Sequence, residues 1–315
     1  MARIALVAVL PALAIAAALG ASSKGAHAAD DAQDKAEANE RCAVRLSIAV
    51  LGKSPDAAQL SSANPQGAVD GMVDSADFAE RWSRFINSEF NGGPSASATD
   101  DPVYYLSKHI VTSKKPWAEM FTGAHAVTAT ATAMEVKDDA AGIGYFTSPA
   151  WMKRYAGNED KGLMLVGAFR TIQNTTGVEL VPSIGNPGDD RTATGRAASP
   201  CKTCHFDQWY ALDKFAALFP VRKGQGDTMT FTPAAGGPQQ LLGKTIADRK
   251  SMVAALVDSD AFKFAQCRNV FKFLYGRPEN QCESKVFDAC VDALEKSKTI
   301  QSAVAAVAKD PSFCQ

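Results

Sequence analysis

The spacing of the hydrophobic residues predicts a mainly α-helical protein. From Cys42 to Leu51 the apolar positions fit one buried helix face, and Gly52 is suited to end that helix. The same periodicity predicts helices near residues 101–111, 116–120, 163–171, 261–275, 283–295 and 300–308. Alternation typical of strands is sparse, apart from residues 228–232. We therefore expect helix-pair modules at both ends of the chain and little β structure.

An internal repeat relates the two ends. Val73-Asp74-Ser75, with Phe78, Arg84, Ile86 and Gly92, matches Val257-Asp258-Ser259, with Phe262, Arg268, Val270 and Gly276, at one constant offset. In both copies we expect a helix to end near Val-Asp, Ser to cap the next helix and Phe to pack against its first turn. Shared helix-cap chemistry and true duplication both account for the match. Either origin predicts an antiparallel helix pair in each region.

The N-terminus has the pattern of a secretory signal peptide. Arg3 precedes an apolar run from Ile4 to Leu19, and Ala26-His27-Ala28 forms a cleavage site of the A-x-A type. A membrane anchor is the alternative, but the run is shorter than the ~20 residues that span a bilayer. No second run of that length follows, so we expect no membrane span in the mature chain. The expected location is the periplasm or the outside of the cell.

Composition breaks suggest four regions. These are a signal peptide at 1–28, an N-terminal helical module at 29–94, a middle segment of helices and loops at 95–198, and a C-terminal helical module at 199–315. Removal of Arg3 and Lys24 changes the formal net charge from −1 to about −3. Such a mild charge does not indicate a nucleic-acid partner.

The pentapeptide Cys201-Lys202-Thr203-Cys204-His205 is the most informative motif of the chain. C-x-x-C-H is typical of c-type haem attachment, in which both thiols bond the porphyrin and the histidine binds the iron. The expected cofactor is one covalent haem c at Cys201 and Cys204, with His205 as the proximal iron ligand. Ser199 and Pro200 are suited to begin a helix that carries this motif and continues through Trp209, Leu212 and Phe215 to Phe219.

Three other interpretations of the two thiols are weaker at the sequence level. A zinc site needs four ligands, and no second C-x-x-C or C-x-x-H exists here. A thioredoxin-like redox pair is usually preceded by a strand of a parallel sheet, which the loop at 182–198 does not supply. A structural disulfide within the motif leaves His205 without a role.

The second iron ligand stays open among several candidates. Met229 lies in a loop after the haem motif, where small cytochromes c often present a thioether. His109 and His125 in the middle segment are alternative distal ligands, although a lone histidine is more often structural. An open site is also possible at this level, and it would permit peroxidase-like or gas-binding chemistry.

Four of the other five cysteines lie within the last 50 residues, which predicts disulfides in an exported chain. Cys267 and Cys290 lie about two turns from the connection between their helices, at similar height. Cys282 and Cys290 would be about 12 Å apart on one helix, too far to bridge. We therefore expect Cys267–Cys290 and Cys282–Cys314. Cys42 is left over, either as a small buried side chain or, as the alternative, in an intermolecular bond.

Several short motifs resemble the planctomycete cytochrome c-like family, secreted haem proteins known mainly as domains of unknown function. They are Leu51-Gly52-Lys53-Ser54-Pro55, Phe78-Ala79-Glu80-Arg81-Trp82, the segments 142–150, 243–245 and 271–277, and Cys201 to His205. The chain departs from the family after the haem motif, where Phe206-Asp207-Gln208-Trp209 replaces a D-P-x-G segment. The resemblance implies a helical, cytochrome c-like, exported haem protein without an established substrate.

Two functional classes follow from the haem motif, and a third does not depend on it. The first is a mono-haem electron-transfer protein with a redox partner protein in the cell envelope. The second is a haem enzyme, such as a peroxidase, with an open distal face. The third is a structural or interaction protein of the cell envelope. No triad, paired-carboxylate or metal-helix motif points to separate catalysis, so an electron carrier is expected ahead of an enzyme.

Overall fold

The computed structural model describes residues 32–91, 101–130, 134–159, 161–180, 188 and 190–315. Its fold is mainly α, as the periodicity predicted, with three antiparallel pairs of short strands in the described part. The signal peptide and part of the 91–94 boundary lie outside the described residues. The division into modules stays a prediction.

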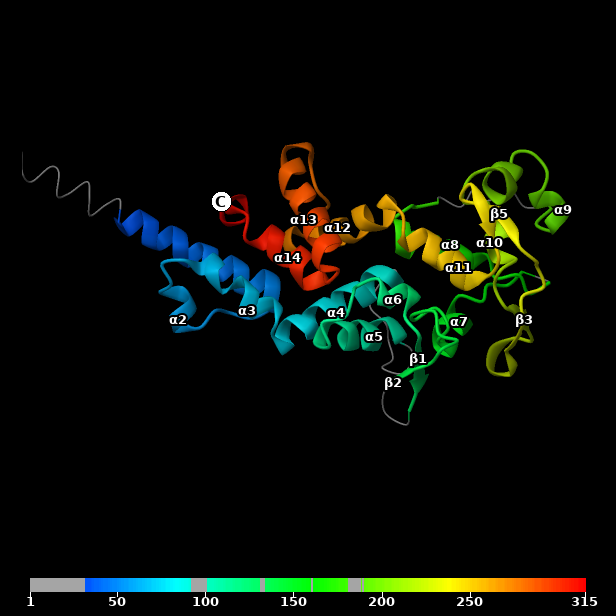
Figure 1. Ribbon diagram of the computed structural model, residues 1–315, viewed down its shortest axis with the longest axis horizontal. Helices are drawn as coiled ribbons and strands as arrows, with labels where there is room; N and C mark the ends of the chain where they lie inside the picture. Colours follow the sequence, from blue (N-terminus) through cyan, green and yellow to red (C-terminus); the bar gives the residue numbers. More distant parts are fainter. Residues whose placement is uncertain (1–31, 92–100, 131–133, 160, 181–187, 189) are drawn as a thin grey trace, which may run out of the picture.

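The N-terminal third is a series of helices (Figure 1). Residues 32–46 form a helix that continues into the π-turn η1 (Ser47–Leu51), and Gly52 ends it with a φ of 72°. A positive φ is costly for residues with a Cβ, so glycine suits this C-terminal position. The following elements are α2 (Ala57–Leu60), η2 (Pro65–Ala68), α3 (Val69–Val73), α4 (Ala76–Asn91), α5 (Pro102–Thr112) and α6 (Glu119–Thr122).

The middle of the chain contains both hairpins and helices. The hairpin β1 (His125–Ala129) and β2 (Met134–Asp138) pairs His125 with Asp138 in register. The elements between this hairpin and Cys201 are α7 (Pro149–Arg154), α8 (Leu165–Thr176) and α9 (Ala193–Arg196). The next elements are η4 (Thr203–Asp207) and α10 (Leu212–Ala216). They are followed by β3 (Val221–Lys223), η5 (Gly226–Thr228), β4 (Thr230–Thr232), β5 (Gln239–Leu241) and β6 (Lys244–Ile246). Most of these strands were not predicted, because segments of three to five residues show too little alternation.

The C-terminal part of the chain is again a series of helices, and one junction in it matches a junction near the N-terminus. They are α11 (Arg249–Val257), α12 (Asp260–Tyr275), η6 (Gln281–Glu283), α13 (Ser284–Ser297), α14 (Ile300–Ala308) and η7 (Pro311–Cys314). Ser75 Oγ accepts from Phe78 N at 3.2 Å before α4, and Ser259 Oγ accepts from Phe262 N at 3.4 Å before α12. Both helices have 16 residues. The predicted pair of serine-capped helices is confirmed.

One hydrophobic core runs through these elements. Trp82 of α4 and Phe273 of α12 are buried, with ring centroids 5.1 Å apart. The buried Trp117 donates through Nε1 to Gln266 Oε1 at 2.9 Å, which ties the loop before α6 to α12. Burial of such large aromatic surfaces is the main source of stability in a fold of this kind.

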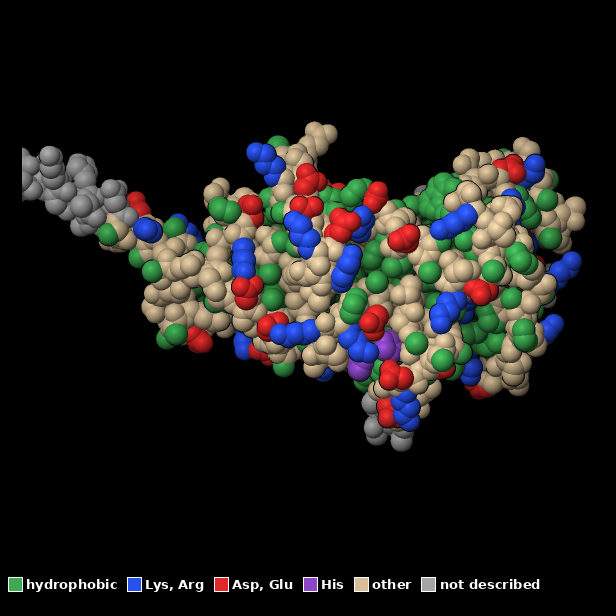
Figure 2. Space-filling model, viewed as in Figure 1, with side chains coloured by type: hydrophobic (Ala, Val, Ile, Leu, Met, Phe, Trp, Pro, Cys, Tyr) green, Lys and Arg blue, Asp and Glu red, His purple; other side chains and the backbone are tan. Residues whose placement is uncertain are grey.

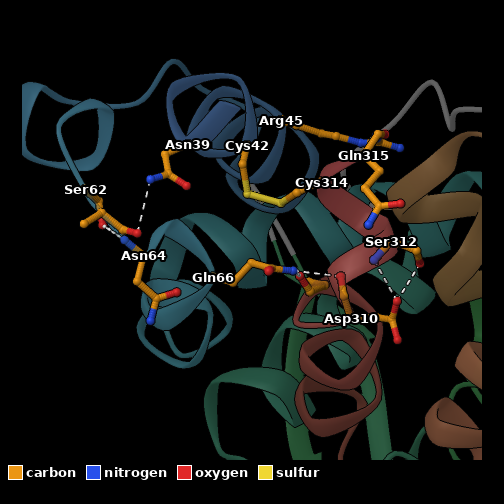
Figure 3. The surroundings of a disulfide bond; sticks show 12 residues. Asn39, Cys42, Arg45, Ser62, Asn64, Gln66, Asp310, Ser312, Cys314 and Gln315 are labelled. Atoms are coloured by element: carbon orange, nitrogen blue, oxygen red, sulfur yellow. Dashed lines mark hydrogen bonds between the residues drawn. A yellow bond between two sulfur atoms is a disulfide. The ribbon is translucent and has the colours of Figure 1, made fainter. Parts of the chain in front are cut away.

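Two disulfides join segments that the sequence separates. Cys267–Cys290 links α12 to α13, as predicted. The prediction of Cys282–Cys314 is wrong, because Cys314 bonds to Cys42 and Cys282 is free. Figure 3 shows the helix of Cys42 beside the C-terminal turn, where Arg45 Nη1 donates to Gln315 O at 2.9 Å. The wrong pairing assumed that the helix at 300–308 brings Cys314 back to Cys282. It did not anticipate that the N-terminal helix lies at the C-terminus, where Cys42 meets Cys314.

The disulfides indicate an oxidising compartment outside the cytoplasm. Within the described ranges, every helix falls short of the length and apolar character that a membrane crossing requires. Figure 2 shows acidic and basic side chains interspersed over the visible face, without a large area of one sign.

Candidate functional site

Two free thiols lie on one turn near the end of the molecule that carries α9 and α10 (Figure 1). The turn comprises Cys201 and the short π-helical segment η4 (Thr203–Asp207). His205 N donates to Cys201 O at 3.2 Å, so the turn is helical across the motif. Cys201 is half-buried and Cys204 is exposed. The thiols are therefore close in sequence, on one turn, and reachable from solvent.

A buried carboxylate holds the histidine of the motif. His205 Nδ1 lies 2.6 Å from Asp213 Oδ2, and the Asp213 side chain is only 7 % exposed. Arg196 donates two hydrogen bonds to the other oxygen of this carboxylate: Nη2 and Nε lie 2.9 and 3.0 Å from Asp213 Oδ1. Arg196 Nη1 also lies 3.6 Å from Glu159 Oε1. Glu159, Arg196 and Asp213 thus form a series of alternating charges that ends at the His205 imidazole, which we call the charge chain.

The charge chain determines the ionisation of Asp213. Burial alone raises the pKa of this carboxyl, but hydrogen bonds from His205 and Arg196 more than compensate, and the pKa lies below its ordinary value. Asp213 is therefore a carboxylate at neutral pH. The carboxylate accepts a hydrogen bond from Nδ1 of His205, and Nε2 is the other ring nitrogen, which is left for proton exchange.

The expected continuous helix from Ser199 to Phe219 is wrong. The chain leaves helical geometry at Gln208, which is extended, and resumes it in α10 (Leu212–Ala216) after Ala211. In an unbroken helix, His205 and Asp213 would be about 12 Å apart along the axis, since each residue rises 1.5 Å. The break lets them form a hydrogen bond. It also places Trp209 on the surface, 42 % exposed, whereas Phe215 and Phe219 are buried in the core.

A tyrosine from this break approaches the exposed thiol. Tyr210 Oη lies 3.8 Å from Cys204 Sγ, within the range of a weak sulfur hydrogen bond. The interaction with Cys204 raises the pKa of the Tyr210 hydroxyl, with burial contributing less. The phenol therefore stays protonated and can donate to a thiolate.

The candidate distal ligands lie on other elements and have other partners. Met229 follows η5 in the β3–β4 hairpin and is half-buried. His125 lies with Nε2 3.2 Å from Glu119 Oε2 and Nδ1 3.6 Å from Asp138 Oδ1, and its ring is 5.6 Å from that of His109. Burial lowers the pKa of His109, and the charge of Lys115 lowers it further. Among the described residues, no hydrogen bond, ion pair or ring contact joins either histidine to the Cys201–His205 turn.

The haem prediction requires correction. Across the described ranges, no group of three or more His, Cys, Asp and Glu side chains is arranged to hold a metal ion. The cysteines that form bonds do so in the two disulfides, and Cys201 and Cys204 are free thiols. The prediction of a mono-haem cytochrome, whether electron carrier or peroxidase-like enzyme, is therefore wrong. The motif describes one turn of chain, whereas an iron site with a second protein ligand also depends on residues from other elements.

Sequence reasoning missed the residues that surround the motif. Asp213 is the one acidic residue between Tyr210 and Phe219, and a lone carboxylate in an apolar segment is a recognisable signal for a buried ion pair. Arg196 and Glu159 carried no such signal, because both stand in polar segments of the sequence, where a charged residue is ordinary.

No known protein family, curated protein or solved structure matches this chain significantly.

Proposed function

We propose that Cys201 and Cys204 form a redox-active dithiol that exchanges electrons with disulfides of partner proteins. The observation that carries this proposal is the pair of free, reachable thiols at C-x-x-C spacing, in a chain whose disulfides indicate an oxidising compartment. C-x-x-C pairs at this spacing can close into a disulfide, and their thiols have lowered pKa values in many oxidoreductases.

The exchange has two steps. The thiolate of Cys204, the more exposed thiol, attacks one sulfur of a partner disulfide and releases the other sulfur as a thiolate. Cys201 then attacks the mixed disulfide, which forms the Cys201–Cys204 bond and frees the second partner thiol. In total, two electrons and two protons pass to the partner, and its disulfide becomes a dithiol. The reverse sequence oxidises a partner dithiol.

Neighbouring groups support the attacking thiol. The Tyr210 hydroxyl can donate to the Cys204 thiolate, and the His205 imidazole, adjacent in sequence, offers a nitrogen for proton transfer. Asp213 and Arg196 act as positioning residues, because Asp213 bonds to the imidazole and Arg196 bonds to Asp213.

The cellular setting is part of the proposal. The N-terminal pattern of Arg3, an apolar run and an A-x-A site supports export to the periplasm or outside the cell. The partner is then a protein of the cell envelope that carries a reducible disulfide or an oxidisable thiol pair.

Reduction of a model disulfide protein by the reduced chain tests this function. The wild-type protein is expected to reduce insulin disulfides in the presence of a thiol reductant, and both Cys201→Ser and Cys204→Ser to lower the rate to the uncatalysed level. Cys282→Ser is the matched control, because Cys282 is also a free, exposed cysteine but no other cysteine lies three residues from it in the sequence. Equal rates in wild type and both site variants would overturn the proposal.

A further inference from the structure

Arg249, the first residue of α11, is a buried cation without an acidic partner. The residue is 6 % exposed, and among the described residues no carboxylate lies within ion-pair distance of its guanidinium. The preceding Asp248 does not pair with it, because its carboxylate caps α11 by accepting from Ser251 N at 2.7 Å. Buried charges in proteins are normally paired, so the unpaired guanidinium needs an explanation.

The contacts of Arg249 satisfy only part of its capacity. One Nη donates to Phe146 O at 2.6 Å, and Nε has no partner. Its central carbon lies 4.3 Å from the Phe219 ring centroid and 5.7 Å from that of Trp151. Aromatic faces attract a cation but carry no net charge, so they do not neutralise it. Burial lowers the pKa of Arg249 to about 9, and the group therefore still carries its charge at neutral pH.

Two further donors without partners among the described residues lie at the start of α7 and within it, and the ring of one of them, Trp151, is beside the Arg249 guanidinium. Ser148, the N-cap residue of α7, makes no side-chain capping bond, and its hydroxyl is buried without a partner. Trp151, whose ring faces Arg249, has a buried indole N–H that is also unpaired. Both residues are 1 % exposed. A cation, a hydroxyl and an indole N–H thus lack the same component, which is an acceptor.

We propose that Arg249, Ser148 and Trp151 bind a small monovalent anion. One negative charge neutralises the guanidinium, whereas a divalent anion would leave an excess charge in an apolar setting. The enclosure by Phe146, Phe219 and Trp151 favours an anion of the size of chloride or formate. The site is independent of the Cys201–Cys204 dithiol, and its occupant stabilises the folded chain because the unfolded chain lacks the site.

Thermal unfolding in chloride and gluconate salts tests this site. At constant ionic strength, replacement of gluconate by chloride is expected to raise the Tm by about 2–4 °C for each tenfold increase in chloride beyond half-saturation. Bromide and formate should act like chloride. The same Tm in chloride and gluconate would overturn the proposal.

Variants separate specific binding from a general salt effect. Arg249→Met removes the charge at similar volume and should abolish the chloride response, whereas Arg268→Met, at an exposed arginine, should retain it. If Arg249→Met does not fold, Ser148→Ala provides the test, because loss of one donor should move the midpoint of the response to a several-fold higher chloride concentration. An unchanged midpoint in Ser148→Ala, or a full response in Arg249→Met, would contradict the site.

Discussion

At the scale of single residues, the function depends on neighbours that the motif does not contain. The C-x-x-C-H motif indicates two thiols and an imidazole on one turn, and the structure places them there. The chemistry of that turn is set by Asp213 and Arg196, which come from other elements and hold His205 from the interior. The motif could be found in the sequence, but its surroundings could not, because the break before α10 determines them.

Replacement of Asp213 by Asn should destabilise the protein by about 2–4 kcal/mol at neutral pH, because it leaves the buried Arg196 without its main counter-charge. The folded pKa of Asp213 lies below its ordinary value, so the unfolded chain binds its proton first as the pH falls. The stabilisation is therefore complete above the unfolded pKa of about 3.9 and is lost as the pH falls through the folded pKa.

Urea unfolding from pH 7 to pH 3 measures both effects. The difference in unfolding free energy between wild type and Asp213→Asn should shrink toward the acidic end. Asp207→Asn is the control, because its exposed carboxylate forms only a surface pair with Lys202 and should change stability by less than about 0.5 kcal/mol. A difference that stays constant across this pH range would contradict the charge chain.

At the scale of elements, hydrophobic periodicity and capping residues predicted the positions of helices that local sequence determines. The helices α5, α8, α12, α13 and α14 fall close to their expected ranges. The errors lie where few residues decide the outcome. Strands of three residues, such as β3 and β5, carry little alternation. The helix predicted after Cys201 breaks at Gln208, and this break lets Asp213 bond to His205.

The repeated serine caps give a matched pair of variants. Ser75→Ala and Ser259→Ala should each destabilise the fold by about 1 kcal/mol, since each removes the same hydrogen bond at the start of a 16-residue helix. Chemical denaturation of both variants and of the double variant checks this. The loss in the double variant should equal the sum of the two single losses, because the two sites are separate. Single variants as stable as the wild type would show that the two caps do not stabilise the fold.

At the scale of the whole molecule, the ends of the chain stabilise each other. The Cys42–Cys314 disulfide closes a loop with a sequence separation of 272 residues. Gln66 Nε2 donates to Asp310 O at 2.8 Å, and the Arg45 guanidinium carbon lies 4.8 Å from the Phe313 ring centroid in the same region (Figure 3). Contacts over this distance leave no trace in local sequence, which is why the pairing of Cys314 was not predicted.

Removal of this bond by Cys42→Ser with Cys314→Ser should lower the unfolding free energy by about 3–5 kcal/mol, because the unfolded chain regains the freedom of a long loop. Calorimetry of the double variant measures the loss. Cys282→Ser, which removes a free thiol, should leave the Tm unchanged. A double variant as stable as wild type would contradict the contribution of the bond.

The central claim is that Cys201 and Cys204 cycle between dithiol and disulfide. Equilibration with glutathione buffers, followed by alkylation and mass spectrometry of the peptide that contains both cysteines, tests it most directly. The account predicts two alkylated thiols at reducing poise, one internal disulfide at oxidising poise, and a potential between about −270 and −120 mV. Cys267–Cys290 should stay oxidised across this range. Thiols that never pair, or a peptide whose cysteines carry a covalent group such as haem, would contradict the claim.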